Sequence, residues 1–348
     1  MISGYILSGG ERRTLFAEGM PGAEIAACTV ESGMNQVDSA ALELPASNLA
    51  TKSLLQKNAV IEIRSDGAVV FLGEVAKPTQ TIFGGVRANL DGPLGWLQNI
   101  CKPPFSITAG SANKAAADFL AAILDQYNAG AEDERMVQLG VVTVTGDVEM
   151  DHSGEYTRTL DLFRECHKQL GGYYYTTYSG GIPKVHYVAA PSDYAGQALT
   201  VGVNVLTLEK QLDYAEYASR VYATGTDEGG NLITQVVINR EAERAFGRVD
   251  YPLKTSEKTP GGVKSAAQKE LDARSAPIQT LQLTAADLED VGADFRAFQL
   301  GTVARCYCTA LGIDVQMMVQ SIKRDYINKT KSVVTFGKSP RTLTGMMN

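Results

Sequence analysis

The chain has 348 residues, more than one typical domain holds, which predicts two to four domains. Apolar residues make up 44% of it and charged residues 20%, values typical of a globular protein, and its formal net charge is −7 at pH 7. This negative balance argues against a protein that grips nucleic acid through its phosphates.

The first residues carry no signal for export or membrane insertion. Glu11, Arg12 and Arg13 interrupt the early apolar positions, and no apolar run approaches the roughly 20 residues that span a bilayer. We therefore expect a soluble protein without a membrane anchor. The five cysteines are odd in number and scattered, which favours buried free thiols over a disulfide framework.

Residues 1–100 are predicted to form a first small β-barrel domain. Short β-rich runs recur there between turns rich in Gly and Asn, at 25–30, 40–44, 60–64, 69–75 and 84–90. Asp66 and Gly67 form a dipeptide that closes tight hairpins. Gly73, inside a strand, indicates a bulge or the close approach of another backbone.

Residues 101–195 are predicted to form an α/β domain. Apolar positions from Ala116 to Tyr127 recur at helical spacing, and Ser111 is placed to cap that helix. A second helix is expected over 156–170, ended by Gly171 and Gly172. The segments at 173–178 and 184–188 then form a hairpin.

After this domain the pattern returns to strands. Residues 196–226 and 297–348 are predicted to build a second β-barrel domain, split by a small inserted domain at 227–296. Within the insert the sequence predicts two strands, a break at 260–262 (Pro-Gly-Gly) and a helix from about 263 to 274. The fold class is therefore a mixed, β-rich α+β protein with two small β-barrels, an α/β domain and an insert.

In this order of elements the chain resembles the phage tail hub family. That family comprises the N-terminal region of siphophage tail-associated lysins (the prophage tail endopeptidase family) and the baseplate hub proteins of contractile tails. The resemblance covers nearly all of the chain and rests on the order of its motifs more than on any one of them. The matching residues are Phe71, Gly73, Val75, Gly225, Asp287, Gly301, Val303, Ile322, Asp325 and Gly337.

The resemblance implies structural work in a virion, with those ten residues carrying fold and interface. Three copies would form a ring that joins a hexameric tail tube to a trimeric tip, spike or fibre and surrounds a channel through which DNA passes without specific binding. The implied partners are a tail tube or distal tail ring protein, a tape measure protein and a spike, fibre or receptor-binding apparatus. The implied location is the tail tip or baseplate, assembled in the host cytoplasm. A long flexible tail, a contractile tail and a phage-derived bacteriocin all remain open.

Lysin members of the family continue into a wall-degrading domain, whereas this sequence ends eleven residues after Gly337. We therefore expect no enzyme, no catalytic residue, no cofactor and no metal. The alternative is a tail-associated peptidoglycan-degrading enzyme or its cell-wall-penetration module.

Residue patterns with chemical potential have structural explanations as well. Cys306 and Cys308 would share one face of a strand, but a zinc site needs two further ligands, and none of the three histidines stands at a familiar spacing. Cys166 and His167 are helical neighbours whose side chains diverge by about 100°. The tyrosines at 173–175 fit strand packing or an interface better than stacking on bases or sugars. An oligonucleotide-binding barrel is a further reading that the acidic charge disfavours.

Overall fold

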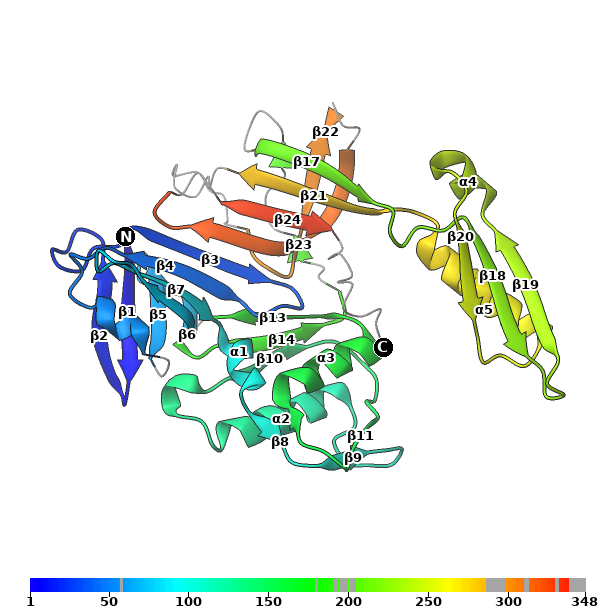
Figure 1. Cartoon of the computed structure of the whole chain (residues 1–348), viewed down its shortest axis with the longest axis horizontal. Coiled ribbons are helices and arrows are strands. Elements are labelled where there is room, and N and C mark those ends of the chain that lie inside the picture. The colour runs from blue at the N-terminus through cyan, green and yellow to red at the C-terminus, as the bar shows by residue number, and fades with distance from the viewer. Residues whose placement is uncertain are drawn as a thin grey trace. The chain divides into compact units, whose positions relative to one another are not determined.

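Figure 1 shows the computed structural model, which describes residues 1–56, 59–178, 181–190, 193–194, 199–200, 205–285, 298–309, 313–328 and 332–337. The chain divides into two compact units. Unit 1 comprises Met1–Leu208 and Leu283–Phe336, and the sheet and helices of unit 2 lie within Glu209–Gln282.

The first β region of unit 1 is an antiparallel sheet in the order β3-β4-β7-β6-β5-β1-β2. Alternate side chains of its strands point into a core of aliphatic and aromatic residues, as the pattern of β1 shows. Asp66 and Gly67 both have positive φ, 49° and 84°, so the predicted tight hairpin turn is confirmed. The strands are β1 (Ile2–Ser8), β2 (Glu11–Ala17), β3 (Ala27–Gly33), β4 (Ser39–Leu44), β5 (Val60–Ser65), β6 (Ala68–Gln80) and β7 (Val86–Asp91).

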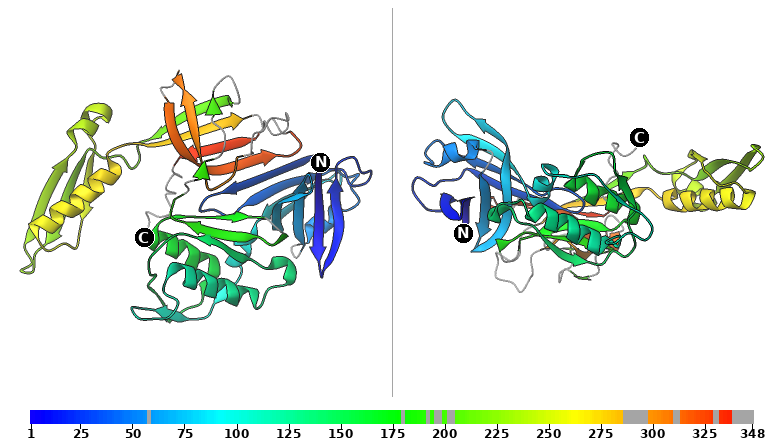
Figure 2. Two further views of the ribbon diagram at one scale, coloured as in Figure 1. Left: turned by 180° about the vertical axis from the view of Figure 1, so that it is seen from behind. Right: turned by 90° about the horizontal axis from the view of Figure 1, so that it is seen from below.

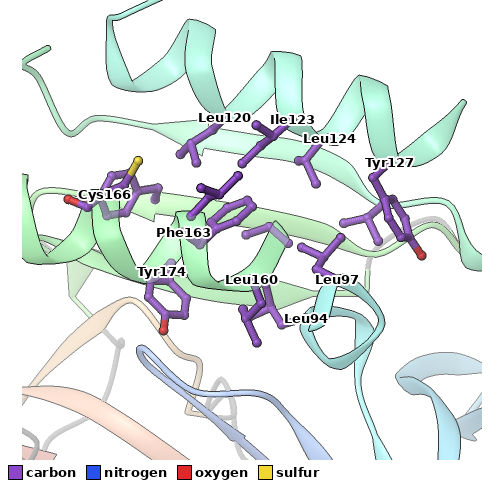
Figure 3. Close-up of a cluster of buried hydrophobic side chains, with 14 of the residues drawn as sticks. Leu94, Leu97, Leu120, Ile123, Leu124, Tyr127, Leu160, Phe163, Cys166 and Tyr174 are labelled. Atoms are coloured by element: carbon purple, nitrogen blue, oxygen red, sulfur yellow. The ribbon is translucent and has the colours of Figure 1, made fainter. Parts of the chain in front are cut away.

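An α/β region follows in unit 1, with a three-stranded sheet ordered β10-β14-β13. Helices α2 and α3 bury their apolar stripes, and Figure 3 shows Leu120, Ile123 and Phe163 meeting in that core. The helices are α1 (Pro93–Gln98), α2 (Ala116–Asn128) and α3 (Thr159–Leu170). The strands are β8 (Cys101–Lys102), β9 (Phe105–Ile107), β10 (Gln138–Val142), β11 (Met150–His152), β12 (Thr157–Arg158), β13 (Tyr173–Thr177) and β14 (Lys184–Val188).

The helix ends correct one prediction and confirm another. Ala115, not Ser111, is the residue before α2, and the Ser111 hydroxyl instead accepts a hydrogen bond from the Thr108 amide at 2.9 Å. A turn at residues 112 and 113, which the apolar periodicity alone does not reveal, separates Ser111 from the helix. Gly171 and Gly172 have φ of 71° and 80°, so the predicted left-handed stop of α3 is confirmed.

The second β region of unit 1 continues the first one. Strand β23 pairs with β22 along its first half and with β24 and β3 along its second half, so the sheet path runs β17-β21-β24-β23-β3. Among the residues described, the strands trace this open path rather than two separate closed barrels. The strands are β15 (Asp193–Tyr194), β16 (Leu199–Thr200), β22 (Thr302–Cys308), β23 (Ile313–Asp325) and β24 (Val333–Gly337), together with β17 (Val205–Asp213) and β21 (Ile278–Ala285), which each begin in one unit and end in the other.

Unit 2 is a three-stranded sheet in the order β19-β18-β20, with α5 packed on one face (Figure 1, Figure 2). Val263, Ala267 and Leu271 of α5 are buried against alternate residues of the strands. Its elements are β18 (Arg220–Thr226), β19 (Leu232–Ile238), α4 (Arg240–Phe246), β20 (Asp250–Lys254) and α5 (Pro260–Arg274).

The boundary of the insert differs from the one expected at 227–296. β18, expected in the second barrel, pairs along its length with β19 and β20, so the inserted unit starts near Glu209 and ends near Gln282. The Pro-Gly-Gly segment is the first turn of α5 rather than a break. Thr259 caps this turn by accepting a hydrogen bond from the Gly262 amide at 3.1 Å, and Pro260 occupies the first helical position, where its missing N–H is harmless.

Candidate functional site

The loop at 34–38, between β3 and β4, fastens the three regions of unit 1 to one another. The Met34 amide donates to the Gln320 carbonyl of β23 at 2.8 Å, and the Asn35 amide donates to the Tyr174 carbonyl of β13 at 2.8 Å. Tyr174 in turn donates its amide to the Asn35 side chain and its hydroxyl to the Asn35 carbonyl, at 2.9 and 3.0 Å. We call residues 34–38 the junction loop.

Asp38 ends the junction loop with a buried carboxyl group, 1% exposed. Its Oδ2 accepts a hydrogen bond from the Tyr178 hydroxyl at 2.7 Å, and its Oδ1 accepts one from the Gly33 amide at 3.2 Å. Burial raises the pKa of Asp38 to about 7, although hydrogen bonds from Tyr178, Gly33 and Ser32 oppose this rise. The pKa of Tyr178 is raised well above its usual value by burial and by the adjacent carboxyl. A carboxyl that changes its charge near neutral pH therefore lies where two regions meet.

A cavity of about 510 Å³ lies beside this contact, between the hairpin β13–β14, strands β3, β6 and β23, and the segment 298–302. On the hairpin, the rings of Tyr175 and His186 stack with centroids 4.9 Å apart. The Val141 amide donates a hydrogen bond to His186 Nδ1 at 3.0 Å, so Nδ1 carries no proton. The ring proton is therefore on Nε2, which donates a hydrogen bond to Thr177 Oγ1 at 2.9 Å. Burial and the nearby Lys184 lower the pKa of His186, so the ring is a neutral bridge.

Two of the residues matched to the family motifs line this cavity. Gly301 has φ of +80°, and a Cβ there would lie 2.8 Å from the Tyr175 hydroxyl oxygen, so both conformation and space require glycine. Ile322 is 7% exposed and lies between Ser32 of β3 and Val334 of β24. Arg324 extends the same wall and donates to the Phe298 carbonyl at 2.8 Å.

Phe71, Gly73 and Val75 lie next to the junction, on β6. Phe71 is fully buried, with its ring centroid 6.0 Å from that of Tyr178, and Val75 is 1% exposed in the same core. A Cβ on Gly73 would lie 2.5 Å from the Asp91 carbonyl oxygen, so the close backbone approach expected there is confirmed.

The other matched residues lie elsewhere. Gly225 is in unit 2, where a Cβ would meet the Glu257 carbonyl oxygen at 2.5 Å. Val303 pairs with Tyr194 and Met318, and Gly337 ends β24. The Asp325 carboxylate accepts hydrogen bonds from the amides of Ile327 and Asn328 at 3.0 and 2.8 Å. These two bonds stabilise the turn after β23. Asp287 lies outside the described residues.

The cysteine and histidine patterns form no catalytic pair in the part of the chain described. Burial and the neighbouring Glu165 raise the pKa of the Cys166 thiol to about 12, which keeps it protonated, and the His167 ring packs on Tyr174 instead. Within the described ranges, no cluster of three or more His, Cys, Asp or Glu side chains could hold a metal ion. No helix there is long and apolar enough to cross a membrane.

Gly301 and Ile322 were expected from the resemblance, whereas nothing in the sequence indicated Asp38 or the junction loop. Asp38 is one acidic residue before a strand, and nothing local distinguishes it from a solvated turn residue. Its importance comes from Tyr178, which is 140 residues away in the chain.

The fold of this chain is similar to the folds of solved phage tail proteins. The tail protein of prophage MuSo2 from Shewanella oneidensis, 43 kDa in size, shares 14% identity with a TM-score of 0.62, over 96% of this chain and 97% of its own. The tail protein from Neisseria meningitidis MC58 shares 12% identity with a TM-score of 0.60, over 97% of each chain. An Escherichia coli component of the type VI secretion system, described as similar to the bacteriophage T4 tail proteins gp27 and gp5, shares 10% identity with a TM-score of 0.51, over 91% of this chain and 75% of its own.

The sequence comparison points the same way. The family described as prophage endopeptidase tail matches residues 193–347. No curated protein matches the chain. The resemblance to a phage tail family, expected from the order of the motifs, is thereby confirmed.

Proposed function

We propose that this protein is a structural component of a phage or prophage tail tip or baseplate hub, where three copies form a ring around the DNA channel. The observation that carries the proposal is the ladder of β23 with β3, which holds two β regions of one chain in fixed register. Three such chains would present six β regions, the number that matches a hexameric tail tube above a trimeric tip, spike or fibre. In such a ring each chain would contact its neighbours head to tail, through two different surfaces.

The junction loop supports this proposal because a ring that bears load needs its β regions held rigidly. Met34 and Asn35 bond to β23 and β13 through backbone groups, and the Asp38–Tyr178 contact adds a buried hydrogen bond. The net charge of −7 suits a channel that lets DNA pass without adhering. The expected neighbours are a tail tube or distal tail ring protein, a tape measure protein and a spike, fibre or receptor-binding apparatus, in a virion assembled in the host cytoplasm.

The mass and shape of the purified protein test the proposal. Native mass spectrometry should give a species of three chains, and negative-stain imaging should show a threefold ring with a pore wide enough for duplex DNA. A protein that remains a single chain at every concentration, and also in tails isolated from the host, would overturn it.

A second candidate is a tail-associated peptidoglycan-degrading enzyme or its wall-penetration module, favoured by the description of the matching family. Purified protein would be incubated with cell-wall sacculi, with and without added zinc, beside a known muralytic enzyme as the positive control. Release of soluble muropeptides by this chain would establish the second candidate, and absent turnover would remove it.

A further inference from the structure

The two edges of the unit 2 sheet differ in how they are protected. β20, at one edge, carries Asp250, Pro252 and Lys254, and proline and charges are the features that keep an edge strand from pairing with another chain. β19, at the other edge, reads Leu-Ile-Thr-Gln-Val-Val-Ile, without charge, proline or glycine. Among the residues described, β19 pairs with β18 alone. Only one edge of this sheet therefore lacks protection.

The backbone of β19 has hydrogen-bonding groups directed away from its own sheet. The Asp227 amide donates to the Asn231 carbonyl at 3.0 Å, and the Asn239 amide donates to the Ser219 carbonyl at 2.9 Å. Hydrogen-bonded and non-bonded pairs alternate along an antiparallel ladder. These two bonds therefore show that the odd-numbered residues of β19 direct their backbone hydrogen bonds to β18. The amides and carbonyls of the four even-numbered residues therefore point toward the open edge: Leu232, Thr234, Val236 and Ile238.

The same four residues place their side chains on the face opposite α5. Leu232 is 70% exposed, Val236 48% and Ile238 38%, whereas Val237, on the α5 face, is buried. An apolar strand with exposed side chains and free backbone groups is suited to pair with another β-strand.

The sequence of β19 is complementary to itself when it is read in the opposite direction. With Gln235 at the centre, an antiparallel copy sets Leu232 opposite Ile238, Ile233 opposite Val237 and Thr234 opposite Val236. The hydrogen-bonded pairs of this register are the even-numbered residues, whose groups are free, while Gln235 faces Gln235 in a non-bonded pair. Side chains and backbone thus favour the same register.

We propose that β19 pairs with β19 of a second copy of this chain, antiparallel about Gln235, which joins two three-stranded sheets into one of six strands. Such a contact uses the same surface on both copies and has twofold symmetry. It cannot close within a threefold ring, so it links chains of different rings or chains that have not entered a ring. The inference goes beyond the proposed hub function and does not depend on it.

A charge on the edge strand tests the pairing by sedimentation velocity over a wide concentration range. The wild-type mass should double with concentration, from one chain to two or from a ring of three to six. Thr234→Lys should weaken this doubling roughly tenfold or more, because two ammonium groups would then lie close together near the twofold axis. Thr224→Lys is the matched control, since Thr224 lies opposite Thr234 on the same face but in the central strand. The control should associate like the wild type, and circular dichroism should show both variants folded.

A disulfide tests the register independently. Gln235→Cys, made with Cys101→Ser to remove an exposed thiol, should give a disulfide-linked dimer under mild oxidation, because non-bonded pairs bring two Cα atoms within disulfide range, at about 4.5 Å. Lys254→Cys, on the protected edge strand β20, should not form such a dimer. Equal cross-linking of the two variants, or unchanged association of Thr234→Lys, would overturn the proposal. A three-chain species that never doubles would support the ring and overturn the β19 pairing.

Discussion

The junction loop of unit 1 forms hydrogen bonds within its own unit, whereas strand β19 of unit 2 directs the backbone groups of alternate residues away from its sheet. In the junction loop the amides of Met34 and Asn35 and the carboxyl of Asp38 all bond to distant parts of unit 1. Along β19 the backbone groups of alternate residues point away from the sheet, among exposed apolar side chains. The difference indicates that unit 1 is built for internal rigidity and unit 2 for presenting a surface.

The two units also differ in the side chains that their cores bury. Unit 1 packs large aromatic and aliphatic side chains such as Phe16, Phe71 and Phe163. In unit 2 the side chains buried between α5 and the sheet are valine, alanine and leucine, and the buried ring of Tyr217 packs separately on Phe246, with centroids 5.7 Å apart. Arg274 pairs with Glu216 at 2.5 Å, and both of these side chains are largely buried. Replacements in the two units should therefore have unequal effects on the free energy of unfolding.

The largest effect is expected for Phe71→Ala, next to the junction. Removal of a fully buried phenylalanine leaves a cavity and should lower the free energy of unfolding of unit 1 by about 3–5 kcal/mol. Urea unfolding followed by circular dichroism would measure it. Phe83→Ala is the control, since Phe83 is 83% exposed and its loss should change stability by less than about 0.5 kcal/mol. Similar losses of stability in the two variants would show that the buried packing of Phe71 does not cause the effect.

Asp38→Asn should remove a pH dependence. Because burial raises the folded-state pKa of Asp38 from 3.8 to about 7, the folded chain keeps a proton that the unfolded chain releases between these values. Stability from this group is therefore present below about pH 4 and lost as pH rises toward 7, by at most roughly 4 kcal/mol. Asparagine stays neutral and can still bond to Gly33 and Tyr178.

Urea unfolding of wild type and Asp38→Asn at pH 5 and pH 8 would measure this difference. Other titrating groups contribute equally to both proteins and cancel. A variant that gains no stability relative to wild type on going from pH 5 to pH 8 would show that Asp38 titrates normally.

Gly225→Ala should destabilise unit 2 by about 1–3 kcal/mol. A Cβ there would overlap the Glu257 carbonyl and the Val263 side chain, so α5 would have to move away from β18. Gly261→Ala serves as the control, because a Cβ at that position meets nothing within 4 Å. Thermal unfolding followed by tryptophan fluorescence should be unchanged in both variants, since Trp96 is in unit 1. A shift of that transition by Gly225→Ala would contradict the expectation that unit 1 unfolds independently of unit 2.

The smallest effect is expected for Thr259→Ala, which removes the cap of α5. Loss of the bond to the Gly262 amide should lower the stability of unit 2 by about 1 kcal/mol. Hydrogen exchange of the first amides of α5 would report it. Thr259→Ser keeps the hydroxyl and should restore the protection, whereas equal exchange in the two variants would exclude a capping role.

Local elements were predictable because their signals lie within a few residues. The Asp66-Gly67 turn, the Gly171 stop of α3 and the space restriction at Gly73 follow from backbone conformation and side-chain size. The start of α2 was displaced from Ser111 to Ala116, because a hydroxyl can stabilise a turn as readily as a helix end. Strand pairing was less predictable, since β18 is equally suited by composition to a barrel or to the insert.

The sequence by itself predicted the resemblance to phage tail proteins, because the order of strands, helices and glycines along the chain is a one-dimensional signal. The same resemblance singled out Gly301 and Ile322, whose roles in fold and interface stay predictions. Only the tertiary structure decided that Asp38 meets Tyr178, that β23 binds β3, and that β19 keeps a free edge. Each of these depends on segments far apart in the chain, and the free energy of such contacts comes from burial and pairing that no single segment contains.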